Sequence, residues 1–123
     1  MKNKELGALG EKLARQRLKR AGYKIVTANY RSLQGEVDLI ARHKACLVFV
    51  EVKCRRDTAF GPPEEAVTAT KQKKLVHVAE FYIQHEAPDT REWRIDVVAI
   101  ELDDRNRPLR IEIIENAVNQ QDY

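Results

Sequence analysis

The segment that decides the fold runs from Gly35 to Lys53 and reads GEVDLIARHKACLVFVEVK. Its first part, Glu36–Arg42, and its last part, Cys46–Lys53, are rich in Val, Ile, Leu and Phe, residues that favour or tolerate buried β-strands. The short stretch His43-Lys44-Ala45 lies between them. The segment therefore predicts an antiparallel β-hairpin.

The register of this hairpin places charged residues on one face. In an antiparallel pair, facing residues have position numbers with a constant sum, and their side chains share a face. If the turn is centred between Lys44 and Ala45, that sum is 89. Asp38 then faces Glu51, and Glu36 faces Lys53. A three-residue turn would shift the register by one residue, so this pairing is a hypothesis about turn length.

Two facing carboxylates need compensation, because their Cβ atoms would lie roughly 5 Å apart and the charges would repel. Lys53 is one candidate, and a hard divalent cation bound by carboxylate oxygens is the other. Mg²⁺ suits a few carboxylates because it retains waters and binds substrate phosphates. Such a site predicts metal-dependent phosphodiester hydrolysis, with the lysine stabilising negative charge. By itself, the pattern of acid, spacer and lysine also arises by chance in a charged chain.

The remaining elements are predicted from hydrophobic spacing and turn residues. Leu6, Leu9, Leu13 and Leu18 predict a helix that Gly22 ends. The other expected elements are a strand at Tyr23–Ala28, a polar turn at Asn29–Gly35, a helix from Glu64 onward, and strands at Trp93–Ile100 and Leu109–Glu115. The order αβββαββ predicts one α/β domain over residues 1–123, with a mixed five-stranded sheet flanked by helices.

The first helix carries two unusual glycines beside a carboxylate. Gly7 and Gly10 project onto or beside the buried arc, where glycine costs roughly 0.5 to 1 kcal/mol relative to alanine. Close approach of another backbone would explain them. Glu11 lies at the edge of the same arc, so it either reaches into a cleft or is an ordinary surface glutamate.

Charge and cysteine usage limit the partners and the compartment. Met1–His77 contains 17 Lys/Arg and 8 Asp/Glu, whereas Val78–Tyr123 contains 5 and 11. This asymmetry predicts a basic surface for a polyanion, although solvated helix faces would give the same count. No signal peptide or membrane span is apparent, and Cys46 and Cys54 are too far apart on an extended strand for a disulfide. We therefore expect a cytoplasmic protein with reduced thiols and no membrane partner.

Further residues are candidates for contact with nucleic acid or for an accessory role. Arg55 and Arg56 follow Lys53 and could bind phosphates, or they belong to a solvated loop. Lys71 and Gln72, near a helix start, could contact a DNA backbone or merely end an amphipathic stripe. Asp96 lies in an apolar strand, where it either pairs with an arginine in a structural network or adds an acid to the cleft. Histidine and cysteine spacing does not predict a zinc site.

The two halves of the hairpin resemble the YraN-like family of uncharacterised bacterial proteins, which is similar to archaeal Holliday-junction resolvases and the PD-(D/E)XK nucleases. The similarity covers nearly the whole chain, including Gly7-x-x-Gly10-Glu11, the segment from Phe60 to Val67, and the late strand from Arg94 to Ala99. The resemblance implies a restriction-endonuclease-like core in which Asp38, Glu51 and Lys53 form the catalytic motif. It also implies that Glu11 acts as a helical glutamate, binding the metal together with Asp38 and Glu51.

The leading hypothesis is a Mg²⁺- or Mn²⁺-dependent endonuclease acting on DNA, with branched or structured DNA as one candidate substrate. Glu36 and Asp96 would be accessory to its site. A homodimer is expected because resolvase-like relatives work as symmetric pairs. The alternative is a nucleic-acid-binding or assembly module that keeps the nuclease fold without cleavage.

Overall fold

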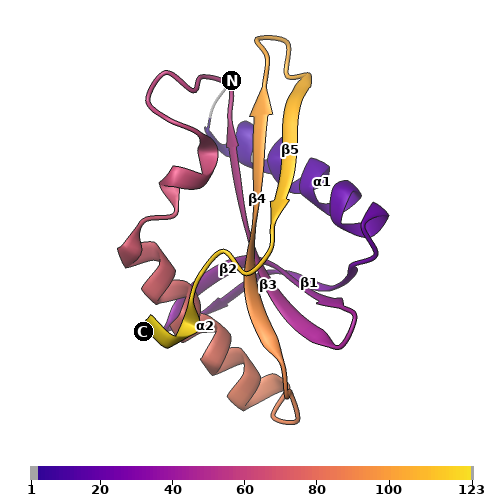
Figure 1. Cartoon of the computed structure of the whole chain (residues 1–123), viewed down its shortest axis with the longest axis vertical. Helices are drawn as coiled ribbons and strands as arrows, with labels where there is room; N and C mark the ends of the chain where they lie inside the picture. The colour runs from indigo at the N-terminus through magenta and orange to yellow at the C-terminus, as the bar shows by residue number, and fades with distance from the viewer. Residues whose placement is uncertain (1–2, 123) are drawn as a thin grey trace.

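The computed structural model describes residues 3–122 as one mixed β-sheet with a helix against each face (Figure 1). Five strands lie in the order β1-β2-β3-β4-β5, and of the neighbouring pairs only β3 and β4 are parallel. The elements are α1 (Asn3–Arg20), β1 (Lys24–Ser32), β2 (Gly35–His43), β3 (Cys46–Arg55), the 3₁₀ helix η1 (Pro63–Ala66), α2 (Ala69–Glu86), β4 (Trp93–Leu102), β5 (Pro108–Ile114) and the 3₁₀ helix η2 (Gln120–Asp122). The expected α/β class, strand number and order αβββαββ are confirmed.

Each helix covers one face of the sheet, and β3 supplies side chains to both. Val48 and Val50 pack with Ala14 and Leu18 of α1, in the core that we call the α1 face. On the opposite α2 face, Leu47 and Phe49 pack with the buried residues of α2, which are Leu75, Val76, Val78 and Ala79. Because side chains alternate along a strand, Glu51 and Lys53 follow Phe49 onto the α2 face.

The parallel pair β3 and β4 is connected through η1 and α2. α2 begins at Ala69, five residues later than Glu64, where the sequence predicted its start. The segment Pro63–Ala66 instead forms a 3₁₀ turn, and Thr68 has extended backbone angles that separate the two helices. The Thr68 hydroxyl accepts a hydrogen bond from the Lys71 backbone N–H at 3.3 Å, which caps α2.

The hairpin of β1 and β2 is longer than predicted. β1 continues to Ser32, so the expected polar turn Asn29–Gly35 shrinks to the residues between Ser32 and Gly35. The prediction ended the strand at Ala28 because Asn29 has turn character. Asn29 does adopt a left-handed φ of 54°, which asparagine tolerates better than most residues, but the strand continues through it.

Only one of the two helix glycines is explained by close packing. A Cβ atom at Gly10 would lie 2.8 Å from Cys54 Cβ, so the contact requiring glycine comes from a side chain of β3. A Cβ atom at Gly7 would meet nothing within 4 Å among the described residues, and the prediction for Gly7 is wrong. α1 therefore packs directly against β3 at Gly10.

The two cysteines of β3 are free thiols, as predicted. Burial raises the pKa of Cys54 to about 11, and burial also raises the pKa of Cys46. Between residues 3 and 122, no helix has the length and apolarity needed to cross a membrane.

Candidate functional site

The candidate site lies where β2 and β3 separate. The recorded pairs run from His43–Cys46 to Leu39–Val50 and all have the predicted sum of 89. One step further, Asp38 and Glu51 no longer pair in the β-ladder, and the Val52 N–H donates to Asp38 Oδ2 at 2.7 Å. A side-chain carboxylate thus accepts the hydrogen bond that a carbonyl of the neighbouring strand would otherwise accept.

A backbone irregularity in β2 turns Asp38 toward β3. Residues two apart on a regular strand share a face, yet Val37 packs on the α2 face and Leu39 on the α1 face. The register of β1 and β2 places Asn29, with its left-handed φ, across from Asp38. The alternation of side chains is therefore interrupted at Asp38.

Glu51 is the buried centre of the site. Only 4% of its surface is exposed, and its Oε2 atom lies 3.3 Å from Lys53 Nζ and 3.0 Å from Lys71 Nζ. Lys53 comes from the same strand and Lys71 from the first turn of α2. Two ammonium groups therefore converge on one carboxylate oxygen, which compensates the negative charge that the sequence predicted here.

The electrostatics of the site follow from burial and from the short distances between charges. Burial raises the pKa of Asp38 to about 7, and the charge of Glu51 and a hydrogen bond between the two carboxyl groups add to this effect. Burial and the neighbouring Lys71 lower the pKa of Lys53. For Lys71, burial is outweighed by the hydrogen bond to Glu51 and by attraction to Glu51 and Asp38, which raise its pKa. The Asp38 carboxyl is therefore poised to hold or release a proton near neutral pH.

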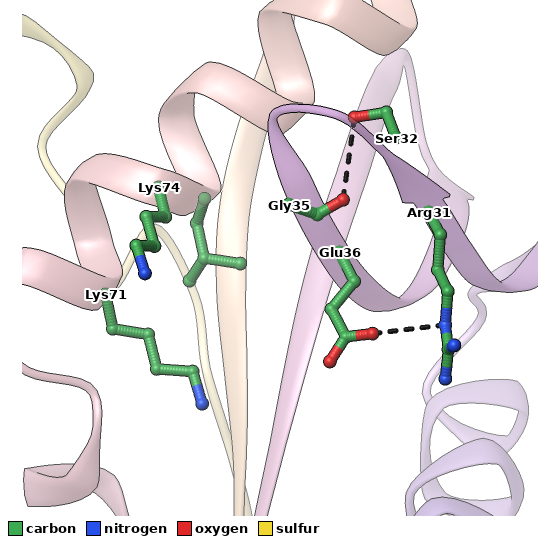
Figure 2. Close-up of a pocket in the computed structure, with 7 residues that line it drawn as sticks. Arg31, Ser32, Gly35, Glu36, Lys71 and Lys74 are labelled. Carbon is green, nitrogen blue, oxygen red and sulfur yellow. Dashed lines mark hydrogen bonds and ion pairs between the residues drawn. The ribbon is translucent and has the colours of Figure 1, made fainter.

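An open groove adjoins this cluster on the α2 face. It has a volume of about 420 Å³ and lies between the β1–β2 hairpin and the first turns of α2 (Figure 2). Glu36 lines this groove and forms an ion pair with Arg31, with 3.2 Å between Glu36 Oε2 and Arg31 Nε. The predicted pairing of Glu36 with Lys53 is wrong, because the ladder of β2 and β3 ends at Leu39 and does not reach Glu36.

Glu11 is not brought into a three-carboxylate cluster. It lies half-buried on α1, one residue after the glycine that contacts Cys54 on the α1 face of β3. Within residues 3–122, no group of three or more His, Cys, Asp or Glu side chains is arranged to hold a metal ion. The geometry joins Asp38 and Glu51, and a role for Glu11 stays a prediction.

The candidate DNA-binding residues are also engaged within the protein. Arg55 Nη1 donates to the Gly61 carbonyl at 3.3 Å, which closes the loop after β3. Gln72 Nε2 donates to the Val67 carbonyl at 3.0 Å. Arg56 is half-buried and close enough to Cys54 to lower its pKa against the larger effect of burial. Their contact with nucleic acid stays a prediction.

Asp96 belongs to a separate network on the α1 face. It is fully buried, pairs with Val50 in the sheet, and accepts from Arg94 Nε at 2.9 Å and Tyr23 Oη at 2.7 Å. It also accepts from the Asn116 backbone N–H at 2.9 Å. Of the two alternatives for Asp96, the structure shows the arginine-paired network and places the residue on the face opposite Glu51.

Two parts of this arrangement escaped the sequence analysis. Lys71 was predicted to contact DNA, yet its ammonium group reaches Glu51, a contact that depends on how α2 docks and that no local pattern encodes. The arginine partner of Asp96 did have a local signal, because Arg94 lies two residues away on the same strand and shares its face.

Comparison with known proteins identifies the family. The model of "Uncharacterised protein family UPF0102" matches residues 10–100. A UPF0102 protein of Caldicellulosiruptor saccharolyticus is 44% identical over 117 residues, which cover 95% of this chain and 99% of the relative. A UPF0102 protein of Syntrophus aciditrophicus is 43% identical over 94% of this chain and 89% of its own length. The chain belongs to the UPF0102 family, the YraN-like group that the hairpin motif indicated.

Proposed function

We propose that this protein is a Mg²⁺- or Mn²⁺-dependent endonuclease that hydrolyses phosphodiester bonds of DNA on a PD-(D/E)XK-type core. The observation that carries the proposal is the meeting of Asp38, Glu51 and Lys53 at one point of the α2 face. These are the residues that the nuclease resemblance implies as its motif. Cytoplasmic location and homodimer formation stay predictions from the sequence.

The donor set fits a magnesium-like ion. Mg²⁺ commonly binds through one or two protein carboxylates and completes its coordination with water and substrate phosphates. Asp38 and Glu51 supply two carboxyl groups within hydrogen-bonding distance of each other, and they would hold the ion. When bound, such an ion polarises a phosphoryl group and lowers the pKa of water.

The chain's own cations have separate parts in this proposal. The Lys53 ammonium group lies beside the Glu51 carboxylate, where the ion and the substrate phosphate would bind. It can therefore stabilise negative charge that develops on a phosphoryl oxygen. Lys71 binds the same Glu51 oxygen from α2 and positions that carboxylate. Burial of Glu51 limits access of water and strengthens both electrostatic interactions.

A cleavage assay tests the proposal. Purified protein is incubated with linear, single-stranded and four-way DNA, with Mg²⁺, with Mn²⁺ and with EDTA. We expect metal-dependent cleavage that falls by about 10² or more in Lys53→Ala, because transition-state stabilisation is lost. Asp38→Asn should also abolish cleavage through loss of the metal site, whereas binding of DNA should change far less.

Lys73→Ala is the matched control, because Lys73 is an exposed lysine of α2 that does not line the groove. Its cleavage rate should equal that of the wild type. Cleavage that survives Lys53→Ala and Asp38→Asn undiminished would come from a contaminant and would overturn the assignment.

A second candidate function is a binding or assembly module without cleavage. One observation favours it: Lys53 and Lys71 already neutralise Glu51, so the carboxyl pair does not require a cation for its compensation. This alternative predicts no metal-dependent cleavage by the wild type and only modest affinity changes in Lys53→Ala and Asp38→Asn.

A further inference from the structure

The groove beside the acidic pair has the chemistry of a nucleic-acid strand site. Its α2 wall carries Lys71 and Lys74, which lie one helical turn apart and both line the groove (Figure 2). The opposite wall carries Arg31 and Glu36, which form an exposed ion pair. Three cations against one carboxylate give the groove a net positive charge, which suits a phosphate backbone.

Lys74 is a groove lysine that no ion pair within residues 3–122 holds in place. It is exposed on α2 and forms no ion pair with another side chain in the described part of the chain, whereas Lys71 is held by Glu51. Lys73, the residue directly before Lys74 on the helix, does not line the groove. The groove therefore presents one unengaged ammonium group next to a lysine that belongs to the acidic cluster.

Apolar residues lie within the groove and in the turn beside it. Leu33, in the turn between β1 and β2, is as exposed as a free side chain, at 102%. Gly35 and Leu75 line the groove next to that turn. Leucine is among the apolar residues that insert against unstacked bases, and base faces are accessible in a single strand but hidden in a continuous duplex.

We propose that this groove holds an unpaired strand leading to Asp38 and Glu51, so that the substrate class is DNA with a single-stranded segment beside the cleaved bond. Lys74 and Lys71 contact its phosphates, and Leu33 packs against a base. The inference rests on the proposed nuclease function for the direction of the strand, but the binding that it describes does not require cleavage.

The test measures binding in EDTA, by fluorescence anisotropy, of three labelled probes: a single strand, a blunt duplex and a duplex with a single-stranded tail. Lys74→Ala should weaken binding of the single strand and the tailed duplex roughly fivefold and reduce the salt slope by about 0.7, while blunt-duplex binding stays unchanged. Leu33→Ser should weaken the same two probes roughly fivefold without changing the salt slope.

Lys73→Ala is the control with the same charge change on the neighbouring residue, and it should leave binding of all three probes unchanged. Equal losses in Lys73→Ala and Lys74→Ala, or equal losses for blunt and unpaired probes, would overturn the groove assignment.

The nuclease proposal and the strand-site proposal can be refuted independently of each other. Absence of metal-dependent cleavage together with the predicted Lys74→Ala pattern would refute the nuclease and keep the strand site. Metal-dependent cleavage without an effect of Lys74→Ala on binding would keep the nuclease and refute the strand site.

Discussion

Asp38→Asn should stabilise the metal-free protein, although it removes a residue of the proposed active site. The pKa of the Asp38 carboxyl rises from 3.8 to about 7, chiefly because burial disfavours its charged form and also because Glu51 repels it. An asparagine at this position can still accept the hydrogen bond from the Val52 N–H through its side-chain oxygen. The substitution therefore removes the charge and keeps the contact.

The sign of the effect follows from proton linkage. Between about pH 4 and pH 7, Asp38 is ionised in the unfolded chain but still protonated in the folded protein, so the folded state binds more protons. The free energy of unfolding therefore falls as pH rises through this window, and the penalty is complete above pH 7. A pKa difference of about three corresponds to about 4 kcal/mol, which is the upper limit of the gain in Asp38→Asn at pH 8.

Urea denaturation in EDTA at pH 4.5 and pH 8 measures this gain. At pH 8 we expect the free energy of unfolding of Asp38→Asn to exceed that of the wild type by about 2 to 4 kcal/mol, and at pH 4.5 the difference should shrink to about 1 kcal/mol or less. Asp89→Asn, which removes a carboxylate from an exposed loop position, should show no such pH dependence. If Asp38→Asn destabilises the protein equally at both pH values, the carboxyl pair is not strained and the reasoning is refuted.

The remaining predictions concern packing, the second network, catalysis and metal binding. Gly10→Ala should destabilise the protein by about 1 to 3 kcal/mol because the added methyl group collides with Cys54, whereas Gly7→Ala, in open space on the same helix, should stabilise it by up to about 1 kcal/mol; equal effects in thermal denaturation would contradict the packing. Arg94→Ala should cost about 3 to 5 kcal/mol in urea denaturation because it leaves the fully buried Asp96 without its cation, and a loss under 1 kcal/mol would show that this pair is dispensable. Lys53→Ala should lower the rate of DNA cleavage by about 10² or more while changing DNA affinity far less, and parallel losses of both would assign Lys53 to binding. Mg²⁺ at pH 8 should raise the melting temperature of the wild type but not of Asp38→Asn, and equal shifts would place the ion elsewhere.

The sequence predicted the strand pairing well because its signals are local. The turn at Lys44 and the alternation of apolar residues fix the register from His43–Cys46 to Leu39–Val50. The prediction failed at Glu36 because it extended that register beyond the point where the strands separate. The separation depends on the backbone irregularity at Asn29 and Asp38, and the sequence analysis had assigned Asn29 to a turn.

Features that depend on how α2 docks could not be predicted from local patterns. Lys71 reaches Glu51 only because α2 starts at Ala69 and buries its Leu75 side chain against the sheet. The sequence placed Lys71 correctly on the face of α2 that carries Leu75, but a helix stripe does not state which strand it will meet. For the same reason, the groove beside the hairpin had no signal in the sequence.

The crossover between β3 and β4 has a consequence for the order in which the site is assembled during folding. β2 and β3 are joined by a short turn, so loop closure favours early formation of this hairpin, which brings Asp38 and Glu51 together. Lys71 arrives only when α2 docks, within the same long connection that allows Leu47 to pair with Trp93. We expect repulsion between the two carboxylates to destabilise the early hairpin until α2 docks and brings Lys71 to Glu51. The charge cluster would then become stable only when the crossover is complete. In a chain truncated before α2, Asp38 and Glu51 would stay apart.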